Sequence, residues 1–384
     1  MSDPIHVLHL LHGMGSGGAE RSVYNLVREL NGETCVPVVC SWRRGGPLEA
    51  ALRAAGIAFE TPPATAPAWL TRLRTVGRLR EIATRRRIDV VHAHMSDSAF
   101  WGVVLQQLIG LPCVITHHST DLIDGIVRRR RLRRWLLSAC ARLAAANVAV
   151  STAVAQQLAA AAGINVDDIV RLPASAPMPP PAALDSSRAA RTARAAAGFA
   201  LDGPTIVYAG RMIETKGVDT LIAAAPDVLH EFPHAAFVLL GGGVLLESLR
   251  QRVQAMGLAA QIRLPGHMTD VSEYLLRADL YVSASRLEGL SLALVEAMSW
   301  GVPVVASDID AHRELLGPQG CGLLVPPDDP PRLAAAVVGA LRDWRAAGAR
   351  AQRANELVRE GYCSSNVARR HYELYRRLVR ERRQ

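Results

Sequence analysis

The stretch that decides the fold is IHVLHLLHGMGSGGAERSVYNLVREL, which runs from Ile5 to Leu30. It opens with an apolar run of strand length, Ile5–Leu11, and closes with the helical periodicity of Gly17–Leu30. The segment between them is rich in glycine, which permits a tight turn from a strand into a helix. The stretch therefore predicts one strand–loop–helix unit of a parallel α/β fold.

The same alternation of apolar runs and helical patterns continues along the chain. Further strands are expected at Thr34–Ser41, Val90–His94, Pro112–Thr116, Val148–Ser151, Thr205–Ala209, Phe237–Gly241, Ile262–Leu264, Leu280–Ser283 and Val302–Ala306. Continuous apolar strands that alternate with helices are typical of parallel sheets covered on both faces. We therefore predict an α/β fold with two Rossmann-like α/β/α domains that face each other across a cleft, where a ligand binds.

A proline-rich stretch from Pro173 to Pro181 interrupts this alternation, because proline does not fit the interior of helices or sheets. The sequence therefore predicts an N-terminal acceptor-side domain over residues 1–172 and a nucleotide-sugar donor domain over 204–365. A linker with a connecting helix, Ser186–Ala197, is expected between them over 173–203. Residues 366–384 are expected to form an amphipathic helix that packs back on the N-terminal domain.

Composition narrows the classes of function. A chain of 384 residues with 49% apolar and 21% charged residues is globular and too long for a single core. No apolar run is long enough to span a bilayer, and six scattered cysteines without a secretory signal indicate reduced thiols in a cytoplasmic protein. The net charge of +9 favours a phosphorylated ligand or an anionic membrane. Nucleic acid is disfavoured, because aromatic residues are only 5% of the chain.

Three glycines, Gly13, Gly15 and Gly18, have the G-x-G-x-x-G spacing of a dinucleotide-binding loop. The next predicted strand is followed by Arg43 rather than by the acidic residue that binds a ribose. An NADP-dependent oxidoreductase therefore stays open as an alternative. The favoured interpretation is that Gly17 and Gly18 let the backbone approach a diphosphate at a helix N-terminus.

Histidines gather at two predicted strand ends. His92 and His94 lie one residue apart on one strand, and His117 and His118 follow the next one. Zinc stays open as a ligand, but no cysteine or carboxylate stands at metal-ligand spacing. We expect instead that His118 forms hydrogen bonds in the cleft and that the protein holds no metal.

Cations and glycines also follow strands in the second half. Gly210 and Arg211 come directly after one predicted strand, and Lys216 precedes the next predicted helix. Two cations at a strand end above a helix N-terminus indicate an anion site. Gly242, within a run of three glycines after the following strand, permits a close approach of the backbone to a ligand.

Two glutamates, Glu288 and Glu296, are the strongest local signal in the chain. Gly289 and Ser291 lie between them, in a segment that leaves a strand and enters a helix predicted over Leu292–Trp300. Because positions about two turns apart lie on nearly one face, we expect both carboxylates to face one side, with one at the loop and the other a turn or two inside the helix.

Asp308 and Asp310 match the D-x-D pattern that holds a divalent metal in a different transferase fold. Here the pair follows a predicted strand, where a turn is expected. Aspartates are common in turns because their side chains bond to nearby backbone amides. A pair of turn aspartates is therefore the favoured interpretation.

Taken together, these features resemble glycosyltransferase family 4, a retaining family with the two-domain GT-B architecture. The matching segments are Gly17–Glu20, Asp89–His94, Thr116–His118, Val150–Ser151, Ala209–Arg211, Lys216–Gly217, Gly241–Gly243, Ser285–Ala297, Gly301–Val305 and Gly322–Pro326. They occur in the family's order over nearly the whole chain. The chain departs from the family pattern at Ala174-Ser175, where Asn-Gly is usual, and at Asp310-Ala311, where many members have two glycines.

The resemblance implies roles for the site residues. Arg211 and Lys216 would grip the donor diphosphate and stabilise the leaving group, and His118 would lie near the sugar on the acceptor side. Glu288 would hold hydroxyls of the donor sugar, together with two loop amides. The other donor contacts are implied for Gly17, Gly18, Gly210, Gly242, Gly289, Leu290, Ser291 and Glu296.

The implied activity is transfer of a sugar from a UDP- or GDP-linked donor, with retention of configuration and without a cofactor. The acceptor is a sugar or a lipid-linked molecule in polysaccharide or glycolipid assembly. Two alternatives stay open beside it: a sugar-nucleotide isomerase or phosphorylase, and a non-catalytic sugar-nucleotide-binding protein. An isomerase would convert the donor without any acceptor.

A basic run, Arg128, Arg129, Arg130 and Arg131, precedes Trp135 in a predicted helix. Its apolar stripe comprises Leu132, Trp135, Leu136, Ala139 and Leu143. The plain interpretation is a core-packed helix with a solvated basic end. The alternative is a surface that binds anionic lipid, which would hold a cytoplasmic enzyme on the inner face of the membrane.

Overall fold

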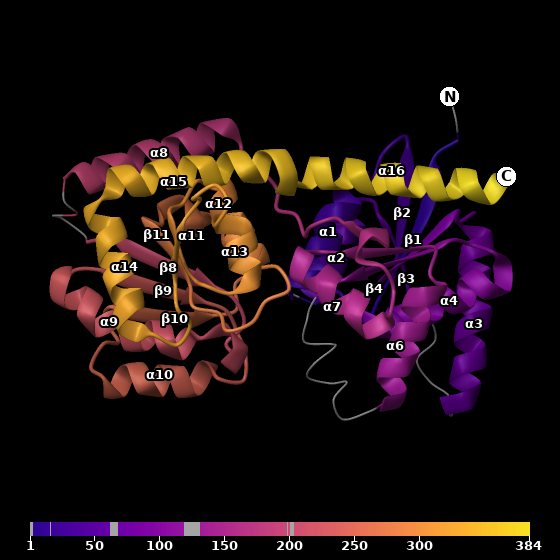
Figure 1. Ribbon diagram of the computed structural model, residues 1–384, viewed down its shortest axis with the longest axis horizontal. Coiled ribbons are helices and arrows are strands. Elements are labelled where there is room, and N and C mark those ends of the chain that lie inside the picture. The colour runs from indigo at the N-terminus through magenta and orange to yellow at the C-terminus, as the bar shows by residue number, and fades with distance from the viewer. Residues whose placement is uncertain (1–2, 16, 62–67, 119–130, 198, 200–202) are drawn as a thin grey trace. The chain divides into compact units, whose positions relative to one another are not determined.

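The computed structural model describes residues 3–15, 17–61, 68–118, 131–197, 199 and 203–384. The chain divides into two compact units, here called unit 1 (Met1–Ser175 with Ser364–Gln384) and unit 2 (Ala176–Cys363). Each unit contains one parallel sheet packed between helices (Figure 1). The prediction of an α/β fold with two Rossmann-like domains is confirmed.

Unit 1 is built on a sheet with the strand order β3-β2-β1-β4-β5-β6-β7. Its strands are β1 (Ile5–Leu11), β2 (Cys35–Ser41), β3 (Ala58–Glu60), β4 (Val90–His94), β5 (Cys113–His117), β6 (Ala146–Ala149) and β7 (Ile169–Arg171). Its helices are α1 (Gly18–Leu30), α2 (Pro47–Ala54), α3 (Ala68–Arg85), α4 (Ser96–Ile109), α6 (Arg131–Leu143), α7 (Thr152–Ala162) and α16 (Ser364–Arg383). The central strands are buried on both faces, which is why their sequences are nearly continuous apolar runs.

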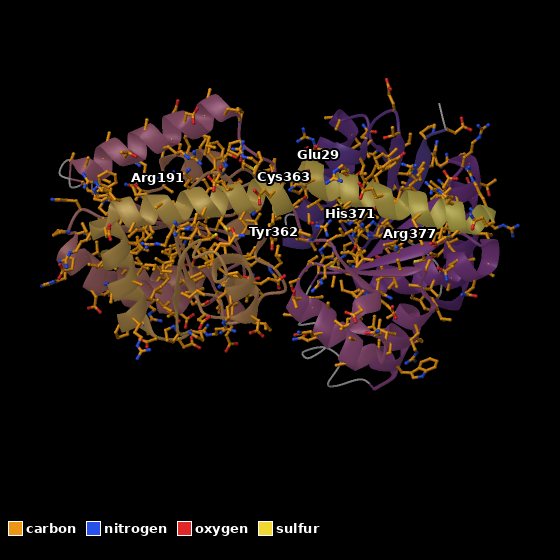
Figure 2. The ribbon with its side chains drawn as sticks, turned by 45° about the horizontal axis from the view of Figure 1, so that its top comes forward. Glu29, Arg191, Tyr362, Cys363, His371 and Arg377 are labelled. Atoms are coloured by element: carbon orange, nitrogen blue, oxygen red, sulfur yellow. The ribbon has the colours of Figure 1, made fainter. Side chains whose placement is uncertain are left out.

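The helix α16 completes unit 1, although the chain reaches it only after the whole of unit 2. Tyr362 and Cys363 end unit 2 at a π-helical turn, and His371 lies on α16 (Figure 2). Leu374, Tyr375 and other residues of α16 share one apolar core with β1, β4 and α1. The helices α1 and α16 therefore cover the same face of the unit 1 sheet.

Unit 2 contains a six-stranded sheet with the order β10-β9-β8-β11-β12-β13. Its strands are β8 (Thr205–Ala209), β9 (Ala236–Leu240), β10 (Ile262–Gly266), β11 (Leu280–Ser283), β12 (Val304–Ser307) and β13 (Leu323–Val325). Its helices are α8 (Pro181–Ala196), α9 (Val218–Glu231), α10 (Leu246–Ala255), α11 (Ser272–Arg277), α12 (Leu292–Ser299), α13 (Asp310–Leu316), α14 (Pro330–Arg342) and α15 (Trp344–Leu357).

The helix predicted as a connector over Ser186–Ala197 differs from the observed one. It begins five residues earlier, at Pro181, because the fixed φ of proline suits the first turn of a helix. It also belongs to unit 2, since Arg191 donates hydrogen bonds of 2.8 Å to the carbonyls of Ala278 and Gly301.

The strand predicted at Val148–Ser151 is also shifted, to Ala146–Ala149. Ser151 is instead the N-cap of α7, where its hydroxyl accepts a hydrogen bond of 3.2 Å from the amide of Val154. All six cysteines lie among the described residues, are buried and form no disulfide. Within the described ranges, no helix is both long and apolar enough to cross a membrane.

Candidate functional site

Two glycines hold the loops at one edge of the unit 2 sheet in backbone contact. At Gly217 (φ 60°) an added Cβ would lie 1.9 Å from the carbonyl oxygen of Ala284. At Gly241 (φ 140°) it would lie 1.7 Å from that of Gly210. Only glycine tolerates both the positive φ and this close approach. The loops that follow β8, β9 and β11 are therefore held together as one surface.

The buried ion pair between Lys216 and Glu288 is the centre of this surface. The Nζ of Lys216 lies 2.5 Å from Oε1 of Glu288, and the hydroxyl of Ser285 donates to the same oxygen at 2.9 Å. Their side chains are only 17% and 8% exposed. Lys216 ends a short 3₁₀ turn in front of α9, and Glu288 lies in the loop after β11. The fold thus joins two residues that the sequence placed in separate motifs.

Arg286 anchors the loop that carries Glu288, and sequence reasoning missed it. Its guanidinium donates to Asp328 at 2.7 Å and to Asp219 at 2.8 Å, while its amide donates to the Thr215 carbonyl at 2.8 Å. Burial alone would raise the pKa of Asp219, but the bonds from Arg286 outweigh it and hold that pKa below its usual range. The loop after β11 is therefore tied to the start of α9.

Arg211 lies between β8 and α9, in the same connection as Lys216. Its side chain is exposed, and its carbonyl accepts a hydrogen bond of 3.3 Å from the Tyr208 hydroxyl. The Tyr281 hydroxyl donates to the neighbouring carbonyl of Ala209 at 3.1 Å. Two buried tyrosines thus fix the backbone on either side of Gly210. The guanidinium of Arg211 is left accessible to an anion.

The two glutamates lie on either side of a helix start, as expected, and a ligand shared by both carboxylates stays a prediction. The helix α12 begins only at Leu292, which leaves Glu288 in the preceding loop and Glu296 inside the helix. Gly289, Leu290 and Ser291 form the entry to this helix, and Ser291 is its N-cap residue. The backbone amides there point toward the loop, as at any helix N-terminus.

Asp308 and Asp310 are both occupied by one arginine. Arg313 donates to a carboxylate oxygen of each at 2.9 Å. Asp310 is the first residue of α13 rather than part of a turn, a position where a carboxylate is favoured by the helix dipole.

In unit 1, Gly17 is the N-cap residue of α1 and Gly18 its first residue. A Cβ on Gly17 would lie 2.3 Å from a carboxylate oxygen of Glu20, in the first turn of the same helix. Gly17 therefore leaves room for Glu20 at this helix start, where the amides are available to an anion.

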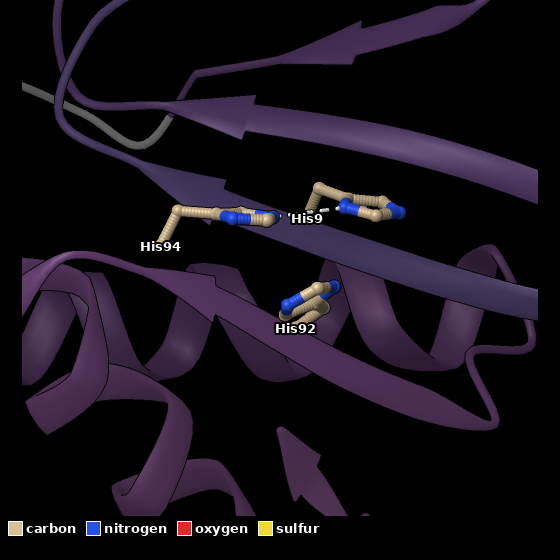
Figure 3. A group of neighbouring side chains, drawn as sticks. All are labelled: His9, His92 and His94. Carbon is tan, nitrogen blue, oxygen red and sulfur yellow. Dashed lines mark hydrogen bonds between the residues drawn. The ribbon is translucent and has the colours of Figure 1, made fainter. Parts of the chain in front are cut away.

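The histidines of unit 1 form a connected buried cluster. Nδ1 of His9 lies 3.1 Å from Nε2 of His94, and Nδ1 of His94 lies 3.3 Å from Nε2 of His118. His9, His92 and His94 come from the adjacent strands β1 and β4, with their rings packed together (Figure 3). His117 turns away and contacts the side-chain oxygen of Asn147 at 3.2 Å. Sequence reasoning missed His9, a polar residue inside an apolar strand.

The three histidines His9, His92 and His94 place ring nitrogens within 4.8 Å of one another, as metal ligands would. Both nitrogens of His92, however, are already bonded at 2.6 Å, to the Tyr375 hydroxyl and to that of Thr116. No carboxylate belongs to the group, so nothing would balance the charge of a buried dication. The residues fit a hydrogen-bonded cluster better than a metal site.

Two family descriptions match the chain. Glycosyltransferase Family 4 matches residues 16–174, and Glycosyl transferases group 1 matches residues 203–343. A phosphatidyl-myo-inositol mannosyltransferase of Mycobacterium leprae is 30% identical over 300 residues, which cover 76% of this chain and 71% of the mannosyltransferase. The chain belongs to glycosyltransferase family 4.

Other similar proteins agree with membership of family 4. An alpha-D-kanosaminyltransferase of Streptomyces kanamyceticus is 28% identical over 289 residues, or 72% of each chain. Among solved structures, Anabaena HepE in complex with UDP has a TM-score of 0.79 at 19% identity, over 96% of this chain and 99% of that one. The likeness to HepE shows a shared fold. Because both named relatives are sugar transferases, family 4 membership removes the NADP-dependent oxidoreductase alternative.

The structure of this family 4 chain describes only part of the basic run. Arg128, Arg129 and Arg130 lie outside the described residues, and Arg131 begins α6 with its side chain not described. Trp135 is described, and it is 60% exposed. The individual roles given to the site residues above stay predictions.

Proposed function

We propose that this protein transfers a sugar from a UDP- or GDP-linked donor to a lipid-linked acceptor, with retention of configuration and without a metal. The observation that carries the proposal is the Lys216–Glu288 pair, with the exposed Arg211 in the same connection between β8 and α9. A UDP complex of HepE and the lipid named in the mannosyltransferase relative support the two substrate classes.

The Lys216–Glu288 pair suits a ligand that is anionic at one end and rich in hydroxyls at the other. Glu288, paired with Lys216, has carboxylate oxygens that can accept hydrogen bonds from sugar hydroxyls. The ammonium of Lys216 has three donors and uses one on Glu288, which leaves others for phosphate oxygens. Arg211 adds a second cation at the same strand end, above the start of α9. This arrangement stabilises the negative charge that develops on a departing diphosphate.

Retention follows from attack on the side of the leaving group. The bond from the anomeric carbon to the phosphate oxygen breaks as the acceptor oxygen bonds to the same face of that carbon. The acceptor's hydroxyl proton passes to the departing phosphate. No carboxylate nucleophile is needed, and the chain's cations supply the charge stabilisation.

The proposal is tested by a thermal-shift panel of UDP- and GDP-sugars, followed by incubation with and without lipid extracts as acceptor. A ligand that binds only the folded protein raises its melting temperature. We expect one donor to raise it, and product of unchanged anomeric configuration to form only with acceptor. Conversion of the donor alone would indicate an isomerase. Binding without turnover on any acceptor would indicate a non-catalytic protein.

Transfer is expected to be insensitive to excess EDTA. Lys216 and Arg211 provide the positive charge that a metal supplies in other transferases, and Arg313 already occupies Asp308 and Asp310. Initial rates with and without the chelator should agree within error. Loss of activity restored by Mg²⁺ or Mn²⁺ would contradict this and point to the aspartates. Restoration by Zn²⁺ alone would point to the three-histidine group.

The surface of α4 and α6 supports membrane contact. Trp135 and Leu143 on α6 are 60% and 52% exposed, and Leu108 on α4 is 60% exposed. The two helices lie side by side, since the side-chain nitrogen of Gln106 donates to the Leu143 carbonyl. Burial of the apolar stripe of α6 was the plain expectation, and it is wrong for Trp135, Leu136 and Leu143, which are exposed. The helix packs through Ser138, Cys140 and Ala141, smaller side chains that let it approach its neighbours.

We therefore expect the protein to co-sediment with anionic vesicles and not with neutral ones. Basic side chains gain about 1 kcal/mol each near an anionic surface, and tryptophan favours the interface. Replacing Arg128 to Arg131 by serine should abolish binding, and Trp135→Ser should weaken it. A matched control removes four exposed arginines of α16, Arg376, Arg377, Arg380 and Arg382, and should bind nearly as wild type. Equal partitioning to neutral vesicles, or none to either, would rule out the electrostatic anchor.

A further inference from the structure

A line of three hydrogen-bonded histidines runs outward from the core of unit 1. His118 follows β5 and is half-buried, whereas His94 on β4 and His9 on β1 are 2% and 0% exposed. Each step is a ring-to-ring hydrogen bond, of 3.3 Å from His118 to His94 and 3.1 Å from His94 to His9. The line ends at Nε2 of His9, which is buried and has no hydrogen-bond partner among the described residues.

The line determines which atom of His118 can meet a ligand. Nε2 of His118 is bonded to His94, so Nδ1 is the ring nitrogen left for a ligand. Burial, with contributions from His117 and His371, lowers the pKa of His118 to about 3. The ring is therefore neutral at physiological pH and carries one proton. It either donates from Nδ1 or accepts there, and the tautomer decides which.

The tautomers of the three rings are linked, because each neutral ring has one proton and each ring-to-ring bond needs one. If the protons point inward, His9 carries its proton on Nε2, as a buried N–H without an acceptor. If they point outward, His9 donates from Nδ1 to His94, His94 donates from Nδ1 to His118, and His118 donates from Nδ1 to the ligand. A buried N–H without a partner is rarer in proteins than an unused acceptor. The outward order is therefore favoured.

We propose that His9 and His94 are positioning residues that hold His118 in the Nδ1–H tautomer, so that it donates a hydrogen bond to an oxygen of the sugar substrate. This inference rests on the proposed function for the identity of the ligand, but not for the tautomer. His92 supports the line from the side: its ring packs on His94 with centroids 4.0 Å apart. Tyr375 of α16 and Thr116 hold both nitrogens of His92 at 2.6 Å.

The tautomers are measured directly in the full-length protein labelled with ¹⁵N-histidine. Long-range ¹H–¹⁵N spectra distinguish protonated from bare ring nitrogens, and the His118 signals are assigned by their loss in His118→Gln. We expect Nδ1–H for His9, His94 and His118, with Nδ1 of His118 shifting when donor is added. Nε2–H on His118 would overturn the proposal.

Two substitutions of His94 separate positioning from packing. His94→Asn keeps an N–H donor close to the former Nδ1, whereas His94→Leu fills the space without a donor. We expect His94→Leu to lower kcat/KM about tenfold, as is typical for the loss of an orienting partner, and to give mixed tautomers of His118. His94→Asn should stay within about threefold of wild type. Equal losses in the two variants would mean a structural role only.

A matched control is His371→Phe, which removes another buried histidine of unit 1. His371 donates to the carbonyl of Val367 on its own helix and has no bond to the line. It should leave the tautomer of His118 unchanged. If no sugar is transferred by the wild-type protein, the proposed function fails while the spectra still report the tautomers. If transfer occurs with Nε2–H on His118, only the present inference fails.

Discussion

Replacing Arg211 or Lys216 by alanine is expected to lower kcat about 100-fold, the usual effect of removing one donor from a developing anion. Both residues follow the same strand, yet their surroundings differ. Arg211 is exposed, whereas Lys216 is held against the buried Glu288 at 2.5 Å. The two variants should therefore differ in stability while they agree in turnover.

Removal of Lys216 leaves a buried carboxylate without its cation, which typically costs about 3–5 kcal/mol. We expect Lys216→Ala to lower the melting temperature of unit 2, and Arg211→Ala to leave it unchanged. Adding Glu288→Gln to Lys216→Ala should restore stability but not kcat, since the charge at the phosphate is still missing.

The measurements are steady-state kinetics at saturating donor and calorimetric melting of each variant. A matched control is Arg252→Ala, which removes the same charge from the exposed face of α10. It should keep both kcat and melting temperature. Folded Arg211 and Lys216 variants with wild-type kcat would remove the diphosphate assignment.

Unit 1 is expected to unfold in mild acid, between about pH 6.5 and 5, while unit 2 stays folded. Burial lowers the pKa of His9 and His118 to about 3 and that of His117 and His371 to about 4. The pKa values of His92 and His94 are also well below the usual range, first because of burial and then because of neighbouring histidines. All six residues belong to unit 1.

The direction of this pH dependence follows from whether the folded or the unfolded state binds more protons. The unfolded chain takes up protons on these histidines near pH 6.5, whereas the folded state does not until far lower pH. The stability they contribute is thus fully present above about pH 6.5 and is lost as the pH falls toward the folded pKa values. Each group loses about 1.4 kcal/mol per pH unit in that window. Six such losses reach the whole stability of a typical domain, about 5–15 kcal/mol, within one to two pH units.

Calorimetry from pH 7.5 to 5 is the measurement. We expect two thermal transitions. The melting temperature of unit 1 should fall steeply as the pH is lowered, and that of unit 2 should change little. Among the described histidines of unit 2, only His312 has a clearly lowered pKa, mainly through burial. The pH dependence of the unit 1 unfolding constant should indicate uptake of several protons. A transition temperature that is constant across this range would refute the prediction.

The central strands were predictable because burial on both faces leaves a clear sequence signal. β1, β4, β8 and β11 have the predicted bounds. The strands β3, β7 and β13, which all lie at sheet edges, were missed. Each of these three has only three residues, too few for an apolar run to stand out from its surroundings.

The candidate site was predictable as residues but not as contacts. The strand-end motifs identified Lys216 and Glu288 separately, and no local pattern joins residues 72 positions apart. The link between His92 and Tyr375 spans 283 positions and exists only because α16 returns to unit 1. Parallel pairing places His9 opposite His92, and that register depends on the order of strands in the finished sheet.

The return of α16 has a consequence for biosynthesis. Unit 1 leaves the ribosome first, but the core that its sheet and α1 share with α16 stays incomplete until all of unit 2 has been made. The usual order, in which the domain made first also folds first, is therefore reversed for this chain. A nascent chain that stops at Cys363 would carry a complete unit 2 and an N-terminal half whose core lacks the apolar residues of α16. Such a half is a substrate for chaperones and proteases rather than a finished domain.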